Sequence, residues 1–448
     1  MSVRSSRSSP SWPRHPLRVA RGASRVRTAL ALVAAVCTAA CAGETPRTSP
    51  QLITLPAPRG EREADRRALL EAIGRAQPGG TLQFAAGTYR IGGGIVVPVP
   101  HLLLRGAPSG TVLEGCSPAE VAALGETAFL AECAGLVLTG AGQQVRALTF
   151  VRFSTALLLA GGQDSIGPLP NRAGGQRVED NTFRESSSLE VWADADVPTV
   201  IRNNRFEHLH HPLQVLGRQV EVRDNRIEST DPMRVPYAWP ATAISLRPVR
   251  GGACGDLLVE GNDIRGHVEG IALTVLPGDA AGATCERIRI VDNTITLSSE
   301  PTPTTARPRT TRASHGVGIR VANLQRAVLD GTIAVSPPPE GWPAAFARAS
   351  VGLVELVRNR VTGARGVAIE LLHAPGAMLA ENDVAPVTPL SARDRDALVR
   401  AGTLADGAGF WLLDPNWRAA NGTAVWRWPA ADSVEVTARP SDGAVTRP

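Results

Sequence analysis

The sequence predicts an all-β chain folded as a single-stranded parallel β-solenoid, with a capping helix at its N-terminal end and a cap at its C-terminal end. Three observations support this fold class. A phrase around an asparagine recurs through the middle of the 448 residues, a phrase with alternating apolar positions follows it, and two cysteines occupy equivalent places in neighbouring repeats. Self-similarity at a short period is typical of stacked repeats, which bury their apolar faces against one another.

Composition narrows the class of protein before any motif is considered. The mean hydropathy is −0.03 and 43% of the residues are hydrophobic, which excludes both wholesale disorder and a polytopic membrane protein. The pI of about 9.2 suggests a nucleic-acid partner at first sight. That basic balance, however, depends on the first forty residues.

Residues 1–40 are predicted to be a signal peptide. They contain seven arginines and no acidic residue, and an apolar run from Thr28 to Ala40 follows the arginines. Removing these seven of the 47 basic residues leaves 40 against 42 acidic ones, so the mature chain is close to neutral and a nucleic-acid partner is not expected. The run ends at Cys41, after small residues that resemble a lipoprotein lipobox. Lipidation of Cys41 is therefore expected, and an ordinary secretory signal is the alternative.

Residues 41–60 are expected to be a linker, and the capping helix follows them. Glu63–Gln77 places Leu69, Ala72 and Ile73 on one helical face, and a Pro-Gly-Gly sequence ends the helix. The first strands are predicted at residues 81–84, 86–91, 102–105 and 111–113. A helix is expected here because the end of a solenoid otherwise exposes an unpaired layer of strands.

The asparagine phrase consists of an apolar strand, a polar residue, the asparagine, any residue, and then Phe, Ile or Val. The asparagines are Asn181, Asn204, Asn225, Asn262, Asn293, Asn359 and Asn382. The short steps of 21 to 23 residues correspond to one coil, and longer steps are coils with insertions or more than one coil, so about ten coils are expected. Asn tolerates the left-handed conformation of a sharp turn, and its stacked amides can form a ladder.

The alternating phrase predicts half-buried strands. It begins at Pro212, Ala243, Gly270, Gly316 and Gly366, and apolar residues recur at every second position. Stacked coils would bury these positions in one continuous core at about 4.8 Å per coil.

The cysteines support the stacked arrangement. Cys254 and Cys285 each lie eight residues before a repeat asparagine, so they occupy the same place in successive coils. Stacked neighbours are within disulfide reach, which predicts a Cys254–Cys285 bridge and leaves Cys116 and Cys133 as the second pair. An oxidising compartment outside the cytoplasm is therefore expected.

The start of the fold also resembles a known family. The pattern of Asp65, Ala68-Leu69-Leu70, Ile73, Gly79-Gly80-Thr81 and Ala86-Gly87-Thr88-Tyr89 looks like the first segment of the pectate-lyase-like right-handed parallel β-helix superfamily. The asparagine coils look like its generic parallel β-helix repeats. The resemblance implies a right-handed β-helix over residues 61–390. It also implies a lyase, hydrolase, epimerase, adhesin or non-enzymatic envelope protein, because the superfamily contains all of these.

Residues 391–448 are expected to form the C-terminal cap. The pattern changes at Ser391, and four tryptophans are concentrated in this segment at positions 411, 417, 426 and 428. Aromatic side chains that cover the last coil are one interpretation, and a platform for stacking carbohydrate is the other.

Candidate site residues come from aligning the alternating phrases. The residues directly before the phrases are predicted to form one column, consisting of His211, Thr242, Glu269, His315 and Arg365. The outward positions within the strands are Glu190, Trp192, Gln214, Ser245, Arg247, Thr274, Arg320 and Glu370. His210 and His267 lie close by in sequence, so histidines gather near one edge of one predicted face.

These residue types suit an acidic polysaccharide. Removing the proton beside a uronate carboxylate requires that its charge be neutralised, a role predicted for Arg247 and Arg320. His211 or His315 would act as the base, oriented by Glu269. Trp192, His210, His267 and Arg365 are expected to contact the substrate. A polysaccharide lyase is therefore preferred to a glycoside hydrolase or epimerase, and a non-catalytic β-helix scaffold or glycan-binding lipoprotein is the alternative.

The sequence also leads to expectations about cofactors and partners. No metal site is expected, although Asp180, Asp194 and Asp196 could form a weak calcium site, with solvated turn acids as the alternative. The partner is expected to be a polysaccharide or cell-envelope glycan. Contact with the membrane would be through the lipid anchor only, and the protein is expected to be a monomer.

Overall fold

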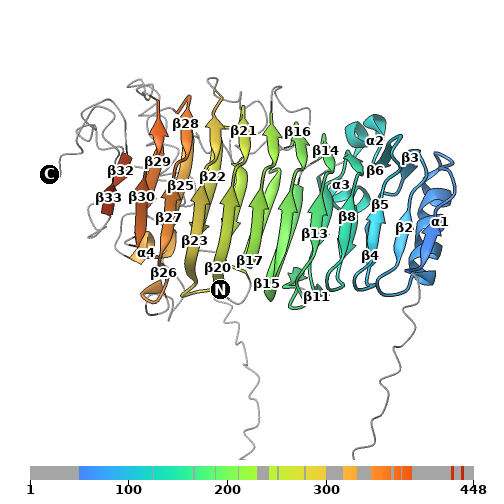
Figure 1. Ribbon diagram of the computed structural model, residues 1–448, viewed down its shortest axis with the longest axis horizontal. Coiled ribbons are helices and arrows are strands. Elements are labelled where there is room, and N and C mark those ends of the chain that lie inside the picture. The colour runs from blue at the N-terminus through green and yellow to red at the C-terminus, as the bar shows by residue number, and fades with distance from the viewer. Residues whose placement is uncertain are drawn as a thin grey trace, which may run out of the picture. The chain divides into compact units, whose positions relative to one another are not determined.

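A computed structural model describes residues 50–385, apart from 125, 165–166, 187, 210, 230–241, 250–251, 277–278, 299–315, 330–343, 345, 365–367 and 375, together with strands at 425–427 and 435–437. The described residues from Pro50 onward form one compact unit. No helix within this described part is both long and apolar enough to cross a membrane. Parallel strands stack coil upon coil through the unit, with helix α1 at one end and β32 and β33 at the other (Figure 1).

Three stacks of parallel strands, faces 1, 2 and 3, make up the coils. Face 1 carries the strand before each asparagine, and its members are β1 (Leu52–Thr54), β2 (Thr81–Gln83), β5 (Leu103–Arg105), β8 (Gln144–Arg146), β13 (Arg177–Glu179), the second halves of β15 (Ser188–Arg202) and β17 (Leu213–Arg223), β20 (Ala253–Glu260), β23 (Thr284–Val291), β26 (Ser350–Val351), β27 (Val354–Val357), β30 (Ala377–Ala380) and β33 (Glu435–Thr437).

Face 2 follows each asparagine turn and is a separate ten-stranded sheet in chain order. Its strands are β3 (Gly87–Arg90), β6 (Thr111–Glu114), β9 (Thr149–Val151), β14 (Thr182–Arg184), β16 (Arg205–Glu207), β18 (Arg226–Glu228), β21 (Asp263–Arg265), β24 (Thr294–Thr296), β28 (Arg360–Thr362) and β31 (Asp383–Val384). The expectation of about ten coils is confirmed.

Face 3 carries the alternating phrases. Its strands are β4 (Ile95–Val97), β7 (Leu136–Leu138), β10 (Thr155–Leu159), the first halves of β15 and β17, β19 (Thr242–Arg247), β22 (Glu269–Val275), β25 (Val317–Asn323), β29 (Ile369–Leu372) and β32 (Val425–Arg427). Faces 1 and 3 join into one sheet because β15 and β17 run through both. The chain is thus a right-handed parallel β-helix, the usual hand for connections between parallel strands.

The asparagine ladder is confirmed, but the expected reason for it is wrong. Each asparagine donates from its backbone N and its Nδ2 to Oδ1 of the next one, as Asn204 does to Asn225 at 3.0 and 3.1 Å. The left-handed residue is the one before the asparagine, for example Asp224 at φ 53° and Arg358 at φ 53°. The asparagine instead closes the turn with its side chain, since Asn204 Nδ2 also donates to the carbonyl of Arg202.

The residue two positions after each asparagine points into the core. Phe183 and Phe206 stack there with ring centroids 4.9 Å apart, and Phe150, the register partner of Phe183 on the coil before the first repeat asparagine, stacks on Phe183 at the same distance. Aliphatic side chains continue this column at Ile227, Ile264, Ile295 and Val361. Such stacked pairs add about 0.5–1.5 kcal/mol each beyond their buried area.

The N-terminal end is covered as expected by α1 (Arg62–Arg75), whose Leu69, Ala72 and Ile73 are buried. The first strand, β1, lies within the segment expected to be a linker and pairs with β2. Two short helices, α2 (Pro118–Ala123) and α3 (Glu126–Glu132), and the antiparallel hairpin of β11 (Gly162–Asp164) and β12 (Gly167–Leu169) were not anticipated. A fourth helix, α4 (Leu324–Leu329), follows β25.

Both predicted disulfides are present. Cys254 and Cys285 are direct register partners on neighbouring coils, with their Cα atoms 4.5 Å apart. Cys116 and Cys133 join the two ends of the α2–α3 excursion, with a Cα separation of 5.4 Å. Two disulfides indicate an oxidising compartment and therefore a location outside the cytoplasm.

Candidate functional site

Strand register on face 3 decides which candidate side chains share a column. Ile244, Ile271, Ile319 and Ile369 pair in succession and point inward. The next residue of each coil points outward, which forms one column of Glu190, Gln214, Ser245, Ala272, Arg320 and Glu370. Because this position holds a different residue on almost every coil, the charge of the surface changes along the axis of the solenoid.

The side chains of Trp192 and Glu190 lie beside each other on the early coils of face 3. Both side chains are half-buried, and the Trp192 indole Nε1 donates to Glu190 Oε2 at 3.4 Å. The other oxygen of Glu190 accepts from Thr155 Oγ1 at 3.1 Å and Ser188 Oγ at 3.0 Å. Three donors therefore hold the carboxylate in place, while the half-buried Gln214 and Ser245 continue the row without charge.

The later coils carry a compact ionic cluster. The Arg320 guanidinium lies between two carboxylates, Glu370 at 2.7 Å and Glu269 at 2.5 Å. The side chains are 14%, 1% and 11% exposed in that order. Thr242 Oγ1 donates to the second oxygen of Glu269 at 2.5 Å. Burial raises the pKa of the Glu370 carboxyl, although the Arg320 guanidinium acts in the opposite direction.

His211 is half-buried at the edge of the same face. Burial lowers the pKa of its imidazole, although the negative charge of Glu269 and a hydrogen bond with the Thr242 backbone act in the opposite direction. The ring is therefore neutral near pH 7, the form in which a histidine accepts a proton. His211, Glu269 and Arg320 are thus brought together, as the column alignment predicted for the first two.

Arg247 does not join this cluster. It occupies a neighbouring outward position, two coils before Arg320, which is about 10 Å along the axis. Its guanidinium pairs with Asp279 at 2.5 Å, and Asp279 also accepts from the backbone N of Leu276. Arg247 therefore already has a carboxylate partner, and the two arginines do not converge on one substrate group.

The predicted column that placed His315 beside Glu269 is wrong. Glu269 pairs in register with Val317, so the last two phrases were aligned two residues out of register. A slip of two residues preserves the alternation of apolar and polar positions, so the pattern alone does not reveal it. His210, His315 and Arg365 themselves lie outside the described residues, as do the Cys41 lipidation site and most of the predicted C-terminal cap.

The predicted contact between His267 and substrate is also wrong. Its side chain lies in the turn before β22, and the residue is only 1% exposed. A polymer outside the solenoid cannot reach a side chain buried to this extent.

Sequence reasoning missed the roles of Thr242 and Glu370 in the cluster. A signal for Glu370 was present, because it follows Ile369 just as Arg320 follows Ile319, which places opposite charges on neighbouring coils. The partner Asp279 gave no such signal, since it lies in the connection after β22, outside the repeated phrases.

The calcium interpretation has little to support it. Asp194 and Asp196 both pair with Arg218, at 2.8 and 3.1 Å. Within the described ranges, no group of three or more His, Cys, Asp or Glu side chains is arranged to hold a metal ion.

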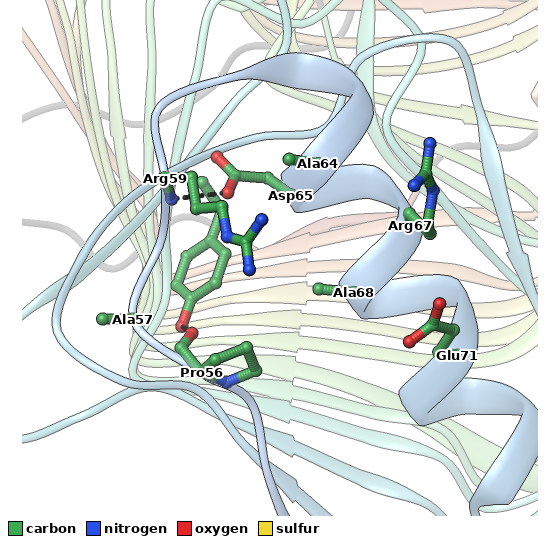
Figure 2. Close-up of a pocket in the computed structure, with 9 residues that line it drawn as sticks. Pro56, Ala57, Arg59, Ala64, Asp65, Arg67, Ala68 and Glu71 are labelled. Carbon is green, nitrogen blue, oxygen red and sulfur yellow. Dashed lines mark hydrogen bonds between the residues drawn. The ribbon is translucent and has the colours of Figure 1, made fainter.

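A separate cavity of about 270 Å³ lies under the N-terminal helix, between α1 and residues 56–59 (Figure 2). Asp65, 2% exposed, is committed to structure there, because it accepts the backbone N–H groups of Arg59 at 2.7 Å, Gly60 at 3.2 Å and Arg90 at 3.1 Å. The Tyr89 hydroxyl donates to the carbonyl of Pro56. These bonds fix the cap to the first coil.

Comparisons with known proteins found only distant structural similarities. No protein-family model and no curated protein matches the chain. Similar solved structures include the surface adhesin PfbA of Streptococcus pneumoniae (11% identity, TM-score 0.37, covering 75% of this chain and 86% of that one) and pectin methylesterase PemA from Erwinia chrysanthemi (10%, 0.32, 81% and 99%). The alginate lyase AlyF-OU02 with G6 is another (12%, 0.35, 75% and 78%). Likenesses this distant carry no inference about activity, and the fold itself rests on the strand pairing above.

Proposed function

We propose that this protein binds a polysaccharide along face 3, outside the cytoplasm. The observation that carries the proposal is the half-buried indole of Trp192, which lies beside a carboxylate held by three donors. An aromatic face next to a few fixed hydrogen-bonding groups suits a sugar ring, which presents both C–H and hydroxyl groups. Gln214 and Ser245 extend the same surface by about 4.8 Å per coil, so a linear polymer would meet one coil after another.

Cleavage by β-elimination is the second candidate function. The neutral imidazole of His211 supports it, with His211 as the base and Glu269 as the group that orients it. The ion pairs of the arginines argue against it. Arg320 is shared by two carboxylates and Arg247 is paired with Asp279, so neither charge is left to neutralise a uronate. Binding without cleavage is therefore the preferred form of the proposal.

The proposal includes an attachment to the cell envelope. A lipid on Cys41 would anchor the chain, and release after cleavage of an ordinary secretory signal is the alternative. His210 and Arg365 remain predicted substrate contacts, and His315 remains a predicted base.

One incubation tests binding and cleavage together. The protein is mixed with polygalacturonate, alginate and a neutral glucan, and both affinity electrophoresis and the absorbance of unsaturated product are followed. We expect Trp192→Ala to weaken binding about tenfold or more, which is about 1.4 kcal/mol or more. Met378→Ala, which removes an exposed apolar side chain from face 1, is the matched control and should bind as the unmodified protein does.

The outcomes separate the candidates. Trp192→Ala that binds every polymer as tightly as the unmodified protein contradicts the proposed site. A rise in absorbance that His211→Ala abolishes would establish β-elimination, whereas binding with no rise on any uronate polymer would establish a non-catalytic glycan-binding protein.

A further inference from the structure

A second surface, on face 1, carries an excess of arginine. Arg105, Arg146 and Arg202 occupy one outward column with Glu179, in the order Arg105, Arg146, Glu179, Arg202 on four successive coils. Arg177 precedes Glu179 by two residues on β13, so it points to the same side of the strand. Arg105, Arg146, Arg177 and Arg202 are called the arginine patch below.

Glu179 organises three of these four side chains. Its carboxylate is 1% exposed and pairs with Arg146, with Arg202 Nε at 2.8 Å and with Arg177 at 3.3 Å. Arg146, Arg177 and Arg202 are 39%, 45% and 45% exposed, so their outer faces remain at the surface. A guanidinium has five N–H donors, and each arginine therefore keeps donors for an external group.

The charges in the patch do not balance. The single carboxylate of Glu179 forms ion pairs with three guanidinium groups. Arg105 is exposed and has no ion pair to any described residue. Four positive charges against one negative leave an excess of three over three coil steps, which is about 14 Å. Holding the side chains on Glu179 also removes part of the rotamer entropy that binding would otherwise cost.

The rest of face 1 shows that this excess is a local feature. The next arginine in the column, Arg223, lies between Glu221 at 3.1 Å and Glu260 at 3.3 Å. Farther along, Arg289 pairs with Glu355 and Arg287 with Asp256. The basic surface therefore ends where the column reaches Arg223.

We propose that the arginine patch binds an acidic polysaccharide, lying along the solenoid axis with its carboxylates on successive guanidinium groups. Arginine recognises carboxylates through two parallel hydrogen bonds, and its repeat at the coil spacing suits a linear polymer with regularly spaced charges. A nucleic acid fits less well, because β5, β8, β13 and the second half of β15 carry no aromatic side chain on which bases could stack. This surface is separate from Trp192 on face 3, and the inference does not depend on the proposed function.

The test compares two double variants that remove the same charge. Arg146→Gln with Arg202→Gln removes half of the patch. Arg287→Gln with Arg358→Gln removes two exposed arginines from elsewhere on the surface, where each arginine is balanced by at least one carboxylate of its own. Binding to polygalacturonate is measured by affinity electrophoresis at two salt concentrations, with all variants made in a Trp192→Ala background so that binding on face 3 does not mask a loss on face 1. We expect the patch variant to bind at least about tenfold more weakly and the control within about twofold of the Trp192→Ala parent, with affinity falling as salt rises.

Arg105→Gln provides a variant that breaks no ion pair, because Arg105 is exposed and has none within the described part of the chain. We expect it to weaken binding about threefold, and unchanged binding by both patch variants would overturn the inference. Equal losses in the patch and control variants would also overturn it, as would tighter binding of single-stranded DNA than of polygalacturonate. Loss of binding in Trp192→Ala with no further loss in the patch variants would overturn this inference and leave the proposed function standing.

Discussion

The asparagine turns and the outward column of face 3 lie on the same coils, but the turns repeat one residue whereas the column varies from coil to coil. Seven asparagines repeat one arrangement, and each of the first six donates to the next through its backbone N and its Nδ2. The face 3 column presents a different residue on almost every coil, from Glu190 to Glu370. Repetition marks the part of the coil that holds the stack together, and variation marks the part that is free to carry a function.

The difference extends to how polar groups are satisfied. In the asparagine turns, the polar groups are neutral amides that hydrogen-bond to one another in the same way in every coil. The face 3 cluster depends on charge, because two carboxylates share one guanidinium at Arg320. Removing a member should therefore cost most in the cluster, where a buried charge is left behind.

The largest expected effect is the loss of Arg320. Arg320→Met leaves Glu269 and Glu370 facing each other without a positive charge, and we expect the free energy of unfolding to fall by about 3–5 kcal/mol. Urea unfolding followed by circular dichroism measures it. Adding Glu269→Gln and Glu370→Gln to the same protein should restore most of the loss, and a single variant that loses less than about 1 kcal/mol would contradict the view of a charge-dependent cluster.

A smaller loss is expected in the ladder. Asn225→Ala removes the side-chain partner of two buried groups, the backbone N of Asn204 and the carbonyl of Ile201, and should cost about 2–4 kcal/mol. The Nδ2 of Asn204 keeps its bonds to the carbonyls of Val178 and Arg202. Asn382→Ala is the matched control, because Asn382 is half-buried at the end of the described ladder and should cost about 1 kcal/mol. Equal losses at the two positions would show that the ladder does not stabilise the stack through its buried bonds.

The pH dependence of stability gives the smallest expected effect. The pKa of Glu370 is raised on folding, so its contribution to stability is present below its unfolded pKa and is lost as the pH rises through the folded value. Glu370→Gln should therefore gain free energy of unfolding relative to the unmodified protein as the pH rises from about 4 to about 8.

The pKa of His211 is lowered on folding, so its contribution to stability is lost as the pH falls, and His211→Gln should become more stable relative to the unmodified protein in acid. Differences that stay flat across this range in urea titrations would contradict both assignments.

The sequence was sufficient for the parts of the fold that repeat. The asparagine spacing predicted the coils, the equivalent positions of Cys254 and Cys285 predicted their bridge, and the amphipathic pattern predicted α1. The sequence led to the wrong turn conformation because Asn tolerates a left-handed backbone best, whereas the structure places that conformation one residue earlier, even at Arg358, and uses the asparagine side chain to close the turn.

The candidate site was less predictable because it depends on register and on contacts between coils. Alternation has a period of two, so Val317 and His315 were equally acceptable partners for Glu269 until the strands were paired. The burial of His267 and the pairing of Arg247 with Asp279 arise from turns and connections, which no repeated phrase describes. Residue type therefore suggested the chemistry, while geometry determined which side chains are available for it.

The central claim is that face 3 carries the glycan site, and a crystal structure of the protein with an oligosaccharide from the polymer it binds tests this most directly. We expect a sugar ring against the Trp192 indole, with hydroxyls within hydrogen-bond distance of Gln214 or Ser245. An oligosaccharide bound only on other surfaces, with Trp192 left uncovered, would contradict it.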